Sequence, residues 1–251
     1  MLELLIQEAM QWWWPVLVVG CAYLILGIAG FGSALVSVPL LAWIWPLPEV
    51  VGLVLLMDIP TSILHGGLNV KSVRLGMLKR TLPGMVAGCA LGLWLIGALE
   101  PRWPLALLGA YVFVVGLQWL RGHTPSSQPL SALRFHVLCG FIGVIEIMFG
   151  TAGPVVLALL RRLLHDVQTI RATAPVVMVV ASILALLSLW ASNAFDMGVV
   201  ANRWMHTFPM AALAVVVGNH FARRIPTPWM VRLVAVLLML CGLSLMRWLW
   251  Q

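Results

Sequence analysis

Apolar segments follow one another along the whole chain, with only short breaks between them. Of the 251 residues, 62% are hydrophobic and 9% are charged, whereas a soluble domain has about 25% charged residues. This pattern excludes an ordinary soluble protein and predicts an all-α, polytopic integral membrane protein. With about 20 residues for a spanning helix, residues 1–251 form a single membrane domain of roughly eight to ten crossings. The segments are approximately 12–28, 31–45, 50–66, 81–98, 103–120, 137–149, 151–164, 174–190, 204–219 and 229–249.

Three of these segments are too short to cross a membrane as straight helices. Segments 31–45, 137–149 and 151–164 would reach only about 20 Å at 1.5 Å per residue, against about 30 Å of hydrocarbon. Each lies beside a glycine-rich break. Non-helical backbone at membrane depth must be sheltered inside the protein or line a cavity. We therefore expect broken helices or re-entrant hairpins at these places.

The basic residues predict the orientation in the membrane. If the N-terminus lies outside and the segments alternate, Arg102, Arg203 and Arg247 lie outside, and the remaining 12 of the 15 lysine and arginine residues are cytoplasmic. Such a bias follows the positive-inside rule. It explains the net charge of +7 without a nucleic-acid partner. The first basic residue is Lys71, so the N-terminus lacks the basic region of a cleaved signal peptide.

The two halves of the chain share landmarks in the same order. The sequence Phe-Gly-Ser at 31–33 recurs as Phe-Gly-Thr at 149–151, 118 residues later. Likewise, Thr-Leu-Pro at 81–83 recurs as Thr-Phe-Pro at 207–209, 126 residues later. Matched landmarks in matched order indicate an internal repeat. The bland alternative is that small membrane folds reuse glycine and proline at helix contacts.

We expect the first repeat to cover residues 12–120 and the second to cover 137–249. Each would contain a broken or re-entrant helix pair followed by three full spans. An odd number of spans per half makes the second repeat enter the membrane from the opposite side. Inverted repeats with interrupted helices near the midplane are a recurrent design of secondary transporters.

The two glycine-rich breaks are the predicted binding site. A half-helix that begins inside the membrane presents free backbone N–H groups and the positive end of its dipole, which together attract an anion. Ser33 and Thr151 can cap these helices or donate a hydroxyl to the ligand, and Arg171 can neutralise an anion passing the second break. The alternative is that the glycines serve only helix packing. The predicted substrate-binding residues are Gly30, Gly32, Ser33, Pro39, Gly150, Thr151, Gly153, Pro154 and Arg171.

Two carboxyl groups lie within apolar segments, where an ionisable group is costly and is a functional candidate by default. Glu146 precedes the second break by three residues and is the preferred carrier of a coupling proton. Asp58 is the second candidate, although it precedes Pro60 and could instead satisfy backbone groups freed by a kink there. No carboxylate occupies the equivalent positions of the other half, so we expect no metal site. His65 belongs with the basic residues that follow it and is read as part of a cytoplasmic anchor.

Motifs of soluble enzymes are absent from the sequence. It contains no GxSxG, HExxH or GxxxxGK[ST] pattern, so we expect neither catalytic residues nor a cofactor. The four cysteines are isolated inside apolar segments, which gives no disulfide framework and no zinc spacing.

Two stretches carry a resemblance to a known family. Residues 27–41 (GIAGFGSALVSVPLL) and 140–160 (GFIGVIEIMFGTAGPVVLALL) resemble the sulfite exporter TauE/SafE family, as does the Leu-Pro-Gly at 82–84. The likeness extends over about residues 15–245. It implies a secondary transporter of small, often sulfur-containing anions, with the predicted glycines, Ser33, Thr151 and the two prolines on the family's motifs. The chain departs from the family by lacking its usual run of consecutive glycines and by carrying Glu146.

These observations predict an exporter of sulfite or an organosulfonate in the inner membrane, working by alternating access with proton coupling. Its partners are the small anion and the lipid bilayer, and a homo-oligomer is left open. Two rival hypotheses are an intramembrane enzyme acting on a lipid-linked substrate and a non-catalytic membrane scaffold. The scaffold leaves the buried carboxylates unexplained.

Overall fold

The computed structural model describes residues 2–66, 75–100, 102–121, 131–164, 167–222 and 227–246. Within these ranges the chain forms ten α-helices and no strands. They are α1 (Leu2–Ala29), α2 (Ser33–Leu41), α3 (Leu47–Gly66), α4 (Leu75–Ala98), α5 (Arg102–Leu120), α6 (Ala132–Phe149), α7 (Gly153–Leu163), α8 (Val167–Ala191), α9 (Met197–Phe221) and α10 (Thr227–Met246).

Six of the described helices are long and apolar enough to cross a membrane, namely α1, α3, α4, α5, α6 and α8. Large apolar side chains also cover the outside of the bundle. Trp94 of α4 is 66% exposed and Leu133 of α6 is 76% exposed, as expected where the neighbour is lipid rather than water. The predicted all-helical, polytopic membrane architecture is confirmed.

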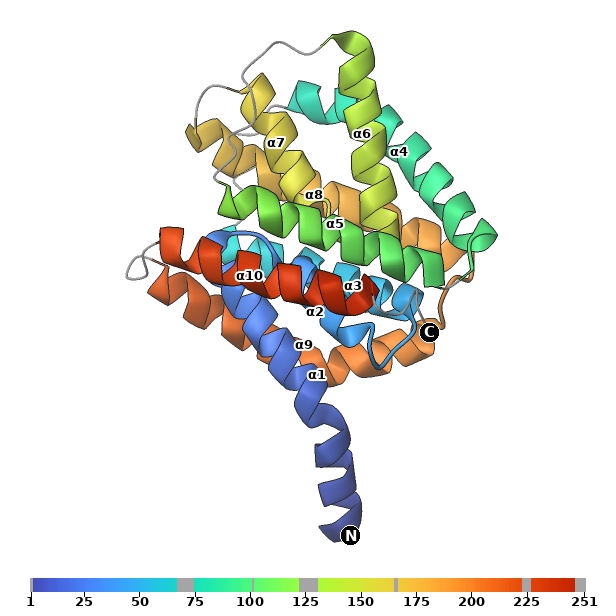
Figure 1. Cartoon of the computed structure of the whole chain (residues 1–251), viewed down its shortest axis with the longest axis vertical. Coiled ribbons are helices and arrows are strands. Elements are labelled where there is room, and N and C mark those ends of the chain that lie inside the picture. The colour runs from blue at the N-terminus through green and yellow to red at the C-terminus, as the bar shows by residue number, and fades with distance from the viewer. Residues whose placement is uncertain are drawn as a thin grey trace.

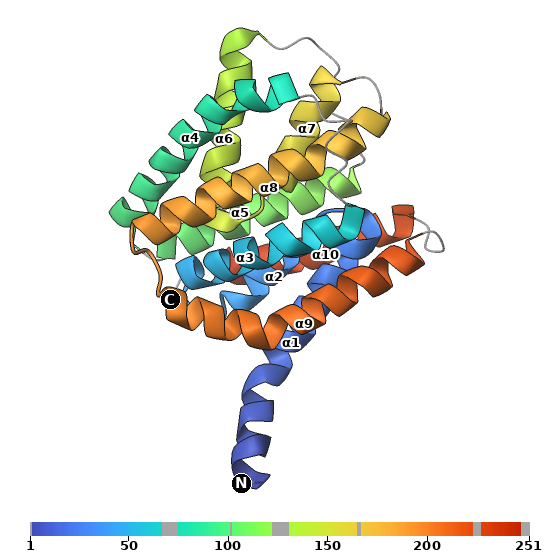
Figure 2. The same ribbon diagram turned by 180° about the vertical axis from the view of Figure 1, so that it is seen from behind.

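The helices pack in three close pairs around a buried centre (Figures 1 and 2). α5 lies along α10, α1 crosses α9, and α4 crosses α6. Between them, α3 packs against both α8 and α9, and the short α2 packs against α1, α3 and α10. Nearly every residue of α2 is buried. Residues 30–32 of the break between α1 and α2 are half-buried, which gives their non-helical backbone part of the shelter that it needs in a membrane.

Glycines let the helices of each pair approach closely, as is common in membrane bundles. A Cβ atom on Gly27 of α1 would lie 2.5 Å from the carbonyl oxygen of Val215 in α9. A Cβ atom on Gly88 of α4 would overlap the backbone of Gly140 in α6. In the third pair, a Cβ atom on Gly109 of α5 would lie 2.8 Å from the carbonyl oxygen of Gly242 in α10. A larger residue at these points would force the helices apart.

Two of the three short segments are short helices. α2 has 9 residues and α7 has 11, so they are about 14 and 17 Å long and reach only part of the way across the hydrocarbon. The prediction for 137–149 is wrong, because α6 has 18 residues and spans Ala132–Phe149. Its first two turns contain the polar residues Arg134 and His136, which a count of apolar residues leaves out. Ser131 caps the helix by accepting a hydrogen bond from the Arg134 N–H.

The helix ends of the two halves correspond at a constant spacing. α1 ends at Ala29 and α6 at Phe149, 120 residues later, and the following helices begin at Ser33 and Gly153, again 120 residues apart. Gly30 and Gly150 both follow directly with positive φ angles. By helix ends and φ angles, Gly150 aligns with Gly30, whereas the match of residue types pairs it with Gly32. Residue identity guided that match, whereas backbone conformation decides the structural equivalence.

Candidate functional site

The first break consists of the three residues between α1 and α2. Gly30 closes α1 with a hydrogen bond of 2.7 Å from its N–H to the Leu26 carbonyl. Gly30 and Gly32 have φ angles of 82° and 103°, in the left-handed region that side-chain-bearing residues avoid. These two glycines turn the chain so that Ser33 can begin α2 beside the end of α1.

The second break, between α6 and α7, is built with one such glycine. Gly150 has a φ angle of 63° and donates a hydrogen bond of 2.8 Å from its N–H to the Glu146 carbonyl. Ala152, directly before α7, has an ordinary right-handed conformation with φ of −70°. Pro154 occupies the first turn of α7, where its missing N–H costs little.

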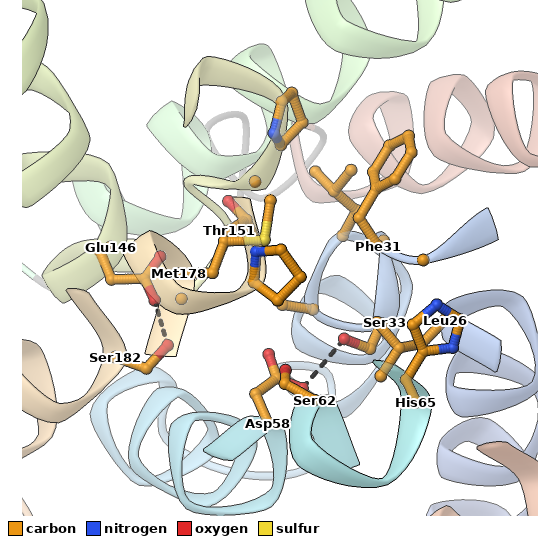
Figure 3. Close-up of a pocket in the computed structure, with 18 residues that line it drawn as sticks. Leu26, Phe31, Ser33, Asp58, Ser62, His65, Glu146, Thr151, Met178 and Ser182 are labelled. Atoms are coloured by element: carbon orange, nitrogen blue, oxygen red, sulfur yellow. Dashed lines mark hydrogen bonds between the residues drawn. The ribbon is translucent and has the colours of Figure 1, made fainter. Parts of the chain in front are cut away.

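The two breaks meet at one pocket (Figure 3). A Cβ atom on Gly153 would lie 3.9 Å from the Cβ of Phe31, so the residues at the two breaks are in contact across the molecule. The pocket has a cavity volume of about 50 Å³, room for a handful of water-sized groups at roughly 10–15 Å³ each. It is lined by Leu26, Gly30–Leu35, Asp58, Ser62, His65, Glu146, Gly150, Thr151, Gly153, Pro154, Pro175, Met178 and Ser182.

Asp58 of α3 faces this pocket and is held by hydroxyl groups. Its Oδ1 accepts hydrogen bonds from the Tyr23 hydroxyl at 2.7 Å and from the Ser33 hydroxyl at 2.9 Å. These two bonds tie α3 to α1 and to the start of α2. The alternative that Asp58 satisfies backbone groups near Pro60 is not what the structure shows, since Thr61 makes the local bond to the Met57 carbonyl at 2.7 Å.

Glu146 of α6 is held at the second break. Its Oε2 accepts a hydrogen bond of 3.0 Å from the backbone N–H of Ala152, and its Oε1 accepts one of 2.6 Å from the Ser182 hydroxyl. The residue is only 4% exposed. A carboxyl group therefore contacts a free N–H at the start of α7, the place where the sequence predicts an anion. Figure 3 shows Glu146 and Ser182 meeting on one side of the pocket.

The predicted capping by Ser33 and Thr151 is wrong. Gly32 and Ala152 occupy the N-cap positions, and neither residue makes a side-chain cap hydrogen bond; at α7 the Glu146 carboxyl group accepts from the Ala152 N–H instead. Ser33 already lies inside α2 and directs its hydroxyl to Asp58. The Thr151 side-chain oxygen is buried and has no hydrogen-bond partner among the described residues. Its own carbonyl accepts a bond of 2.9 Å from the Tyr111 hydroxyl, which fixes the backbone there.

Most of the predicted site residues are brought together at this pocket. Among the predicted site residues whose side chains the structure describes, Pro39 is the exception. It is buried in α2 and is not one of the lining residues. Arg171 belongs to α8, and its side chain lies outside the described part of the structure. The predicted residues that line the pocket are Gly30, Gly32, Ser33, Asp58, Glu146, Gly150, Thr151, Gly153 and Pro154.

Several lining residues escaped the sequence analysis. Ser62, Met178 and Ser182 line the pocket, and Ser182 is the hydrogen-bond partner of Glu146. Tyr23, the partner of Asp58, was missed as well, although it is not itself among the lining residues. His65, assigned from sequence to a cytoplasmic anchor, faces the pocket instead, with its Nε2 3.2 Å from where a Cβ atom on Gly30 would be. One signal was available for the serines: Ser-Ile-Leu at 62–64 recurs at 182–184, at the same spacing of 120 residues.

The pocket has the chemistry of a site for a small oxyanion. Two half-helices begin at it, so backbone N–H groups and helix dipoles favour negative charge there. Hydroxyl groups line it, and two carboxyl groups offer places for a proton. Among the described residues, no group of three or more His, Cys, Asp or Glu side chains lies close enough together to hold a metal ion.

Comparison with known proteins gives two matches. Residues 16–245 match the family model described as Sulfite exporter TauE/SafE. The chain is 48% identical over 200 residues to a protein of Comamonas testosteroni described as "Probable inner membrane transporter protein TsaS", which covers 80% of this chain and 84% of that protein. The family and this relative are transporters rather than enzymes, which removes the support for an intramembrane enzyme. No solved structure matches the chain.

Proposed function

The chain belongs to the sulfite exporter TauE/SafE family of membrane transporters, and from this premise we propose that it exports sulfite or an organosulfonate across the inner membrane. The observation that carries the proposal is the shared pocket, where both helix breaks meet. The substrate's oxygen atoms would lie between the starts of α2 and α7. Backbone N–H groups, Ser33 and Thr151 would bind them.

We further propose that α1–α5 and α6–α10 form inverted repeats. Contacts between the two halves come in corresponding pairs when α1–α3 are shifted by 120 residues and α4–α5 by 126 residues. Each contact between α1 and α9 then corresponds to one between α6 and α4, and each contact between α5 and α10 corresponds to another contact of the same helix pair. The corresponding pairs are Gly20–Met210 with Gly140–Gly84, Gly27–Gly218 with Ile147–Gly92, and Gly109–Gly242 with Ala235–Gly116.

This arrangement supports transport by alternating access. The glycine-mediated pairs α1–α9 and α4–α6 lie on opposite sides of the pocket-bearing centre (Figure 1). If the side that contains α1 and α9 rocks against the side that contains α4 and α6, each side with one helix from each repeat, the pocket opens first to the cytoplasm and then to the outside. Glu146, or Asp58 in second place, would carry the coupling proton. The positive-inside bias places the N-terminus outside, which a pair of topology reporters fused to the two termini tests.

Uptake into proteoliposomes tests the transport function. Purified protein is reconstituted and offered a panel of labelled anions, including sulfite, sulfoacetate and methanesulfonate, with and without an imposed pH gradient. We expect uptake of at least one of these sulfur oxyanions, and we expect the gradient to change its rate. Uptake of none of them would overturn the proposed substrate class.

Substitution at the breaks tests the site. Gly32→Leu and Gly150→Leu should abolish uptake while leaving membrane insertion intact, because both positions need a positive φ angle and lie beside the ligand. Gly97→Leu is the matched control, since Gly97 lies on an exposed part of α4 and an added Cβ meets nothing within 4 Å. Flux at the wild-type rate in either break variant would refute the site.

A further inference from the structure

The N-terminus of α7 is already occupied by a negative group of the chain itself. The Ala152 N–H at the N-cap of α7 donates to Glu146 Oε2, and the Ser182 hydroxyl donates to Oε1 of the same carboxyl group. Both carboxyl oxygens of Glu146 therefore accept hydrogen bonds at the place where the oxygens of a bound oxyanion would be expected to accept them. The carboxyl group has the shape and charge of two oxygens of a sulfite or sulfonate group.

One buried donor beside this carboxylate has no partner. The Thr151 side-chain oxygen lies in the pocket wall, is fully enclosed, and finds no hydrogen-bond partner within the described residues. Threonine 151 as a whole is 3% exposed. An unpaired buried hydroxyl is costly and rare. Its position next to the α7 N-terminus indicates that a ligand with more oxygen atoms than one carboxylate completes this site.

We propose that Glu146 is a tethered competitor of the transported anion for the α7 N-terminus, and that the anion displaces it when Glu146 takes up a proton. The inference rests on the proposed function and adds to it the way in which substrate and proton exchange. One proton from the solvent adds to a Glu146 oxygen, and the neutral acid releases the Ala152 N–H. That N–H and the Thr151 hydroxyl then donate to the anion's oxygens, so one proton enters the pocket for each anion.

The surroundings of Glu146 agree with such an exchange. The titratable groups of neighbouring helices that interact electrostatically with Glu146 are Asp58 of α3, Cys89 of α4 and Tyr111 of α5, while Ser182 of α8 donates a hydrogen bond to it. His65 of α3 also lines the pocket. The basic residues of α7, Arg161 and Arg162, lie in its last turn, at the other end of the helix. No lysine or arginine among the described residues lines the pocket to hold the anion in Glu146's place.

A change in the pH dependence of anion binding tests the proposal. The probe is methanesulfonate, whose own charge does not change across the neutral range, with sulfite uptake measured in parallel. In the wild type, methanesulfonate binding should strengthen as the pH falls, because Glu146 must be neutral to release the site. In Glu146→Gln, methanesulfonate binding should no longer depend on pH. At the alkaline end of the pH range it should be about tenfold tighter than in the wild type, because one charged competitor is lost.

A second variant and a control keep the test decisive. Ser182→Ala removes one of the two hydrogen bonds that hold the Glu146 carboxylate. It should also tighten methanesulfonate binding, by less than Glu146→Gln does, and it keeps the test possible if Glu146→Gln folds poorly. Glu100→Gln is the matched control, since that carboxyl group is exposed and paired with Arg102 on the surface.

The possible results separate the two proposals. Binding that is weaker in both Glu146→Gln and Ser182→Ala, or a pH dependence that persists in Glu146→Gln, would overturn the competitor and leave the transport function standing. A wild-type protein that neither binds methanesulfonate nor takes up sulfite would overturn both the competitor and the proposed substrate class.

Discussion

The two helix breaks reach the same pocket by different means. The first break uses two glycines with positive φ angles, and its carboxyl group comes from another helix, Asp58 of α3. The second break uses one such glycine, and its carboxyl group comes from the last turn of its own α6, six residues before the N–H that it binds. The first break is therefore fixed by packing between helices, and the second by a local contact.

This difference indicates which break can release its carboxyl group without disturbing the other helices. Releasing Asp58 would leave the Ser33 hydroxyl without its acceptor and the Tyr23 hydroxyl with only its longer bond of 3.4 Å to the Val54 carbonyl, and it would loosen the contact of α3 with α1 and α2. Releasing Glu146 frees only the Ala152 N–H and one hydroxyl on α8. The proposed proton-driven exchange would therefore cost less free energy at the second break than at the first, and the first break would act as the rigid half of the site.

The largest expected effect separates the two backbone conformations. Asparagine tolerates the left-handed region near φ of +60°, which matches Gly150 at 63° but not Gly32 at 103°. We expect Gly32→Asn to lower uptake by about tenfold or more and Gly150→Asn to lower it by less than about threefold, since strained backbone costs on the order of 1–3 kcal/mol.

The space around the two glycines is matched, so sterics do not decide this comparison. An added Cβ atom would have its nearest neighbour at 3.7 Å in both cases, Ile25 for Gly32 and Leu55 for Gly150. Uptake is measured at equal amounts of reconstituted protein. Equal losses in the two variants would show that the breaks do not differ in the way described.

The next effect concerns the carboxyl group that fixes the first break. Asp58→Ala leaves the Ser33 hydroxyl unpaired and leaves the Tyr23 hydroxyl with only its longer bond of 3.4 Å to the Val54 carbonyl. An unpaired buried group costs about 1–3 kcal/mol, whereas Asp58→Asn keeps an acceptor for both hydroxyls. The unfolding temperature in detergent should fall markedly for the alanine variant and less for the asparagine variant. Adding Tyr23→Phe should reduce the loss of stability caused by Asp58→Ala, because the Tyr23 hydroxyl that lost its Asp58 acceptor is then absent. Additive losses in the double variant would argue against the Tyr23–Asp58 hydrogen bond.

The smallest effect distinguishes the two hydroxyl groups at the breaks. Ser33→Ala removes a bond to Asp58 and should cost about 1 kcal/mol of stability. Thr151→Val keeps the shape, removes an unpaired hydroxyl and should cost nothing, yet it should weaken anion binding by about tenfold. Thermal unfolding and methanesulfonate binding are measured on the same samples. A Thr151→Val protein with unchanged affinity would mean that this hydroxyl does not bind the ligand.

Much of this site could be predicted from the sequence, because interrupted helices have a local signature. Glycine clusters at 30–32 and 150–153 beside short apolar segments were enough to place both breaks, and a carboxyl group inside an apolar run stands out by its cost. The meeting of the breaks at one pocket was expected from the predicted internal repeat. The all-helical membrane architecture followed from composition and segment length.

What the sequence could not supply depends on contacts between distant segments. Tyr23 and Ser182 look like ordinary residues of apolar helices, and only the packing of α1 and α8 brings them to the carboxyl groups. His65 was grouped with the basic residues after it, although its side chain points inward. Pro39 was included because it shares a motif with the break, but it lies six positions after Ser33 along α2 and does not line the pocket.

The central claim is that the two interrupted helices form a single anion site. The most direct measurement is an experimental reconstruction of the protein in a lipid nanodisc, enlarged by a bound antibody fragment and saturated with the transported anion. The account predicts density for the anion between the starts of α2 and α7, within hydrogen-bond distance of Ser33 and Thr151, with Glu146 displaced from Ala152. An empty pocket with the anion bound elsewhere, or continuous helices through residues 30–32 and 150–152, would contradict it.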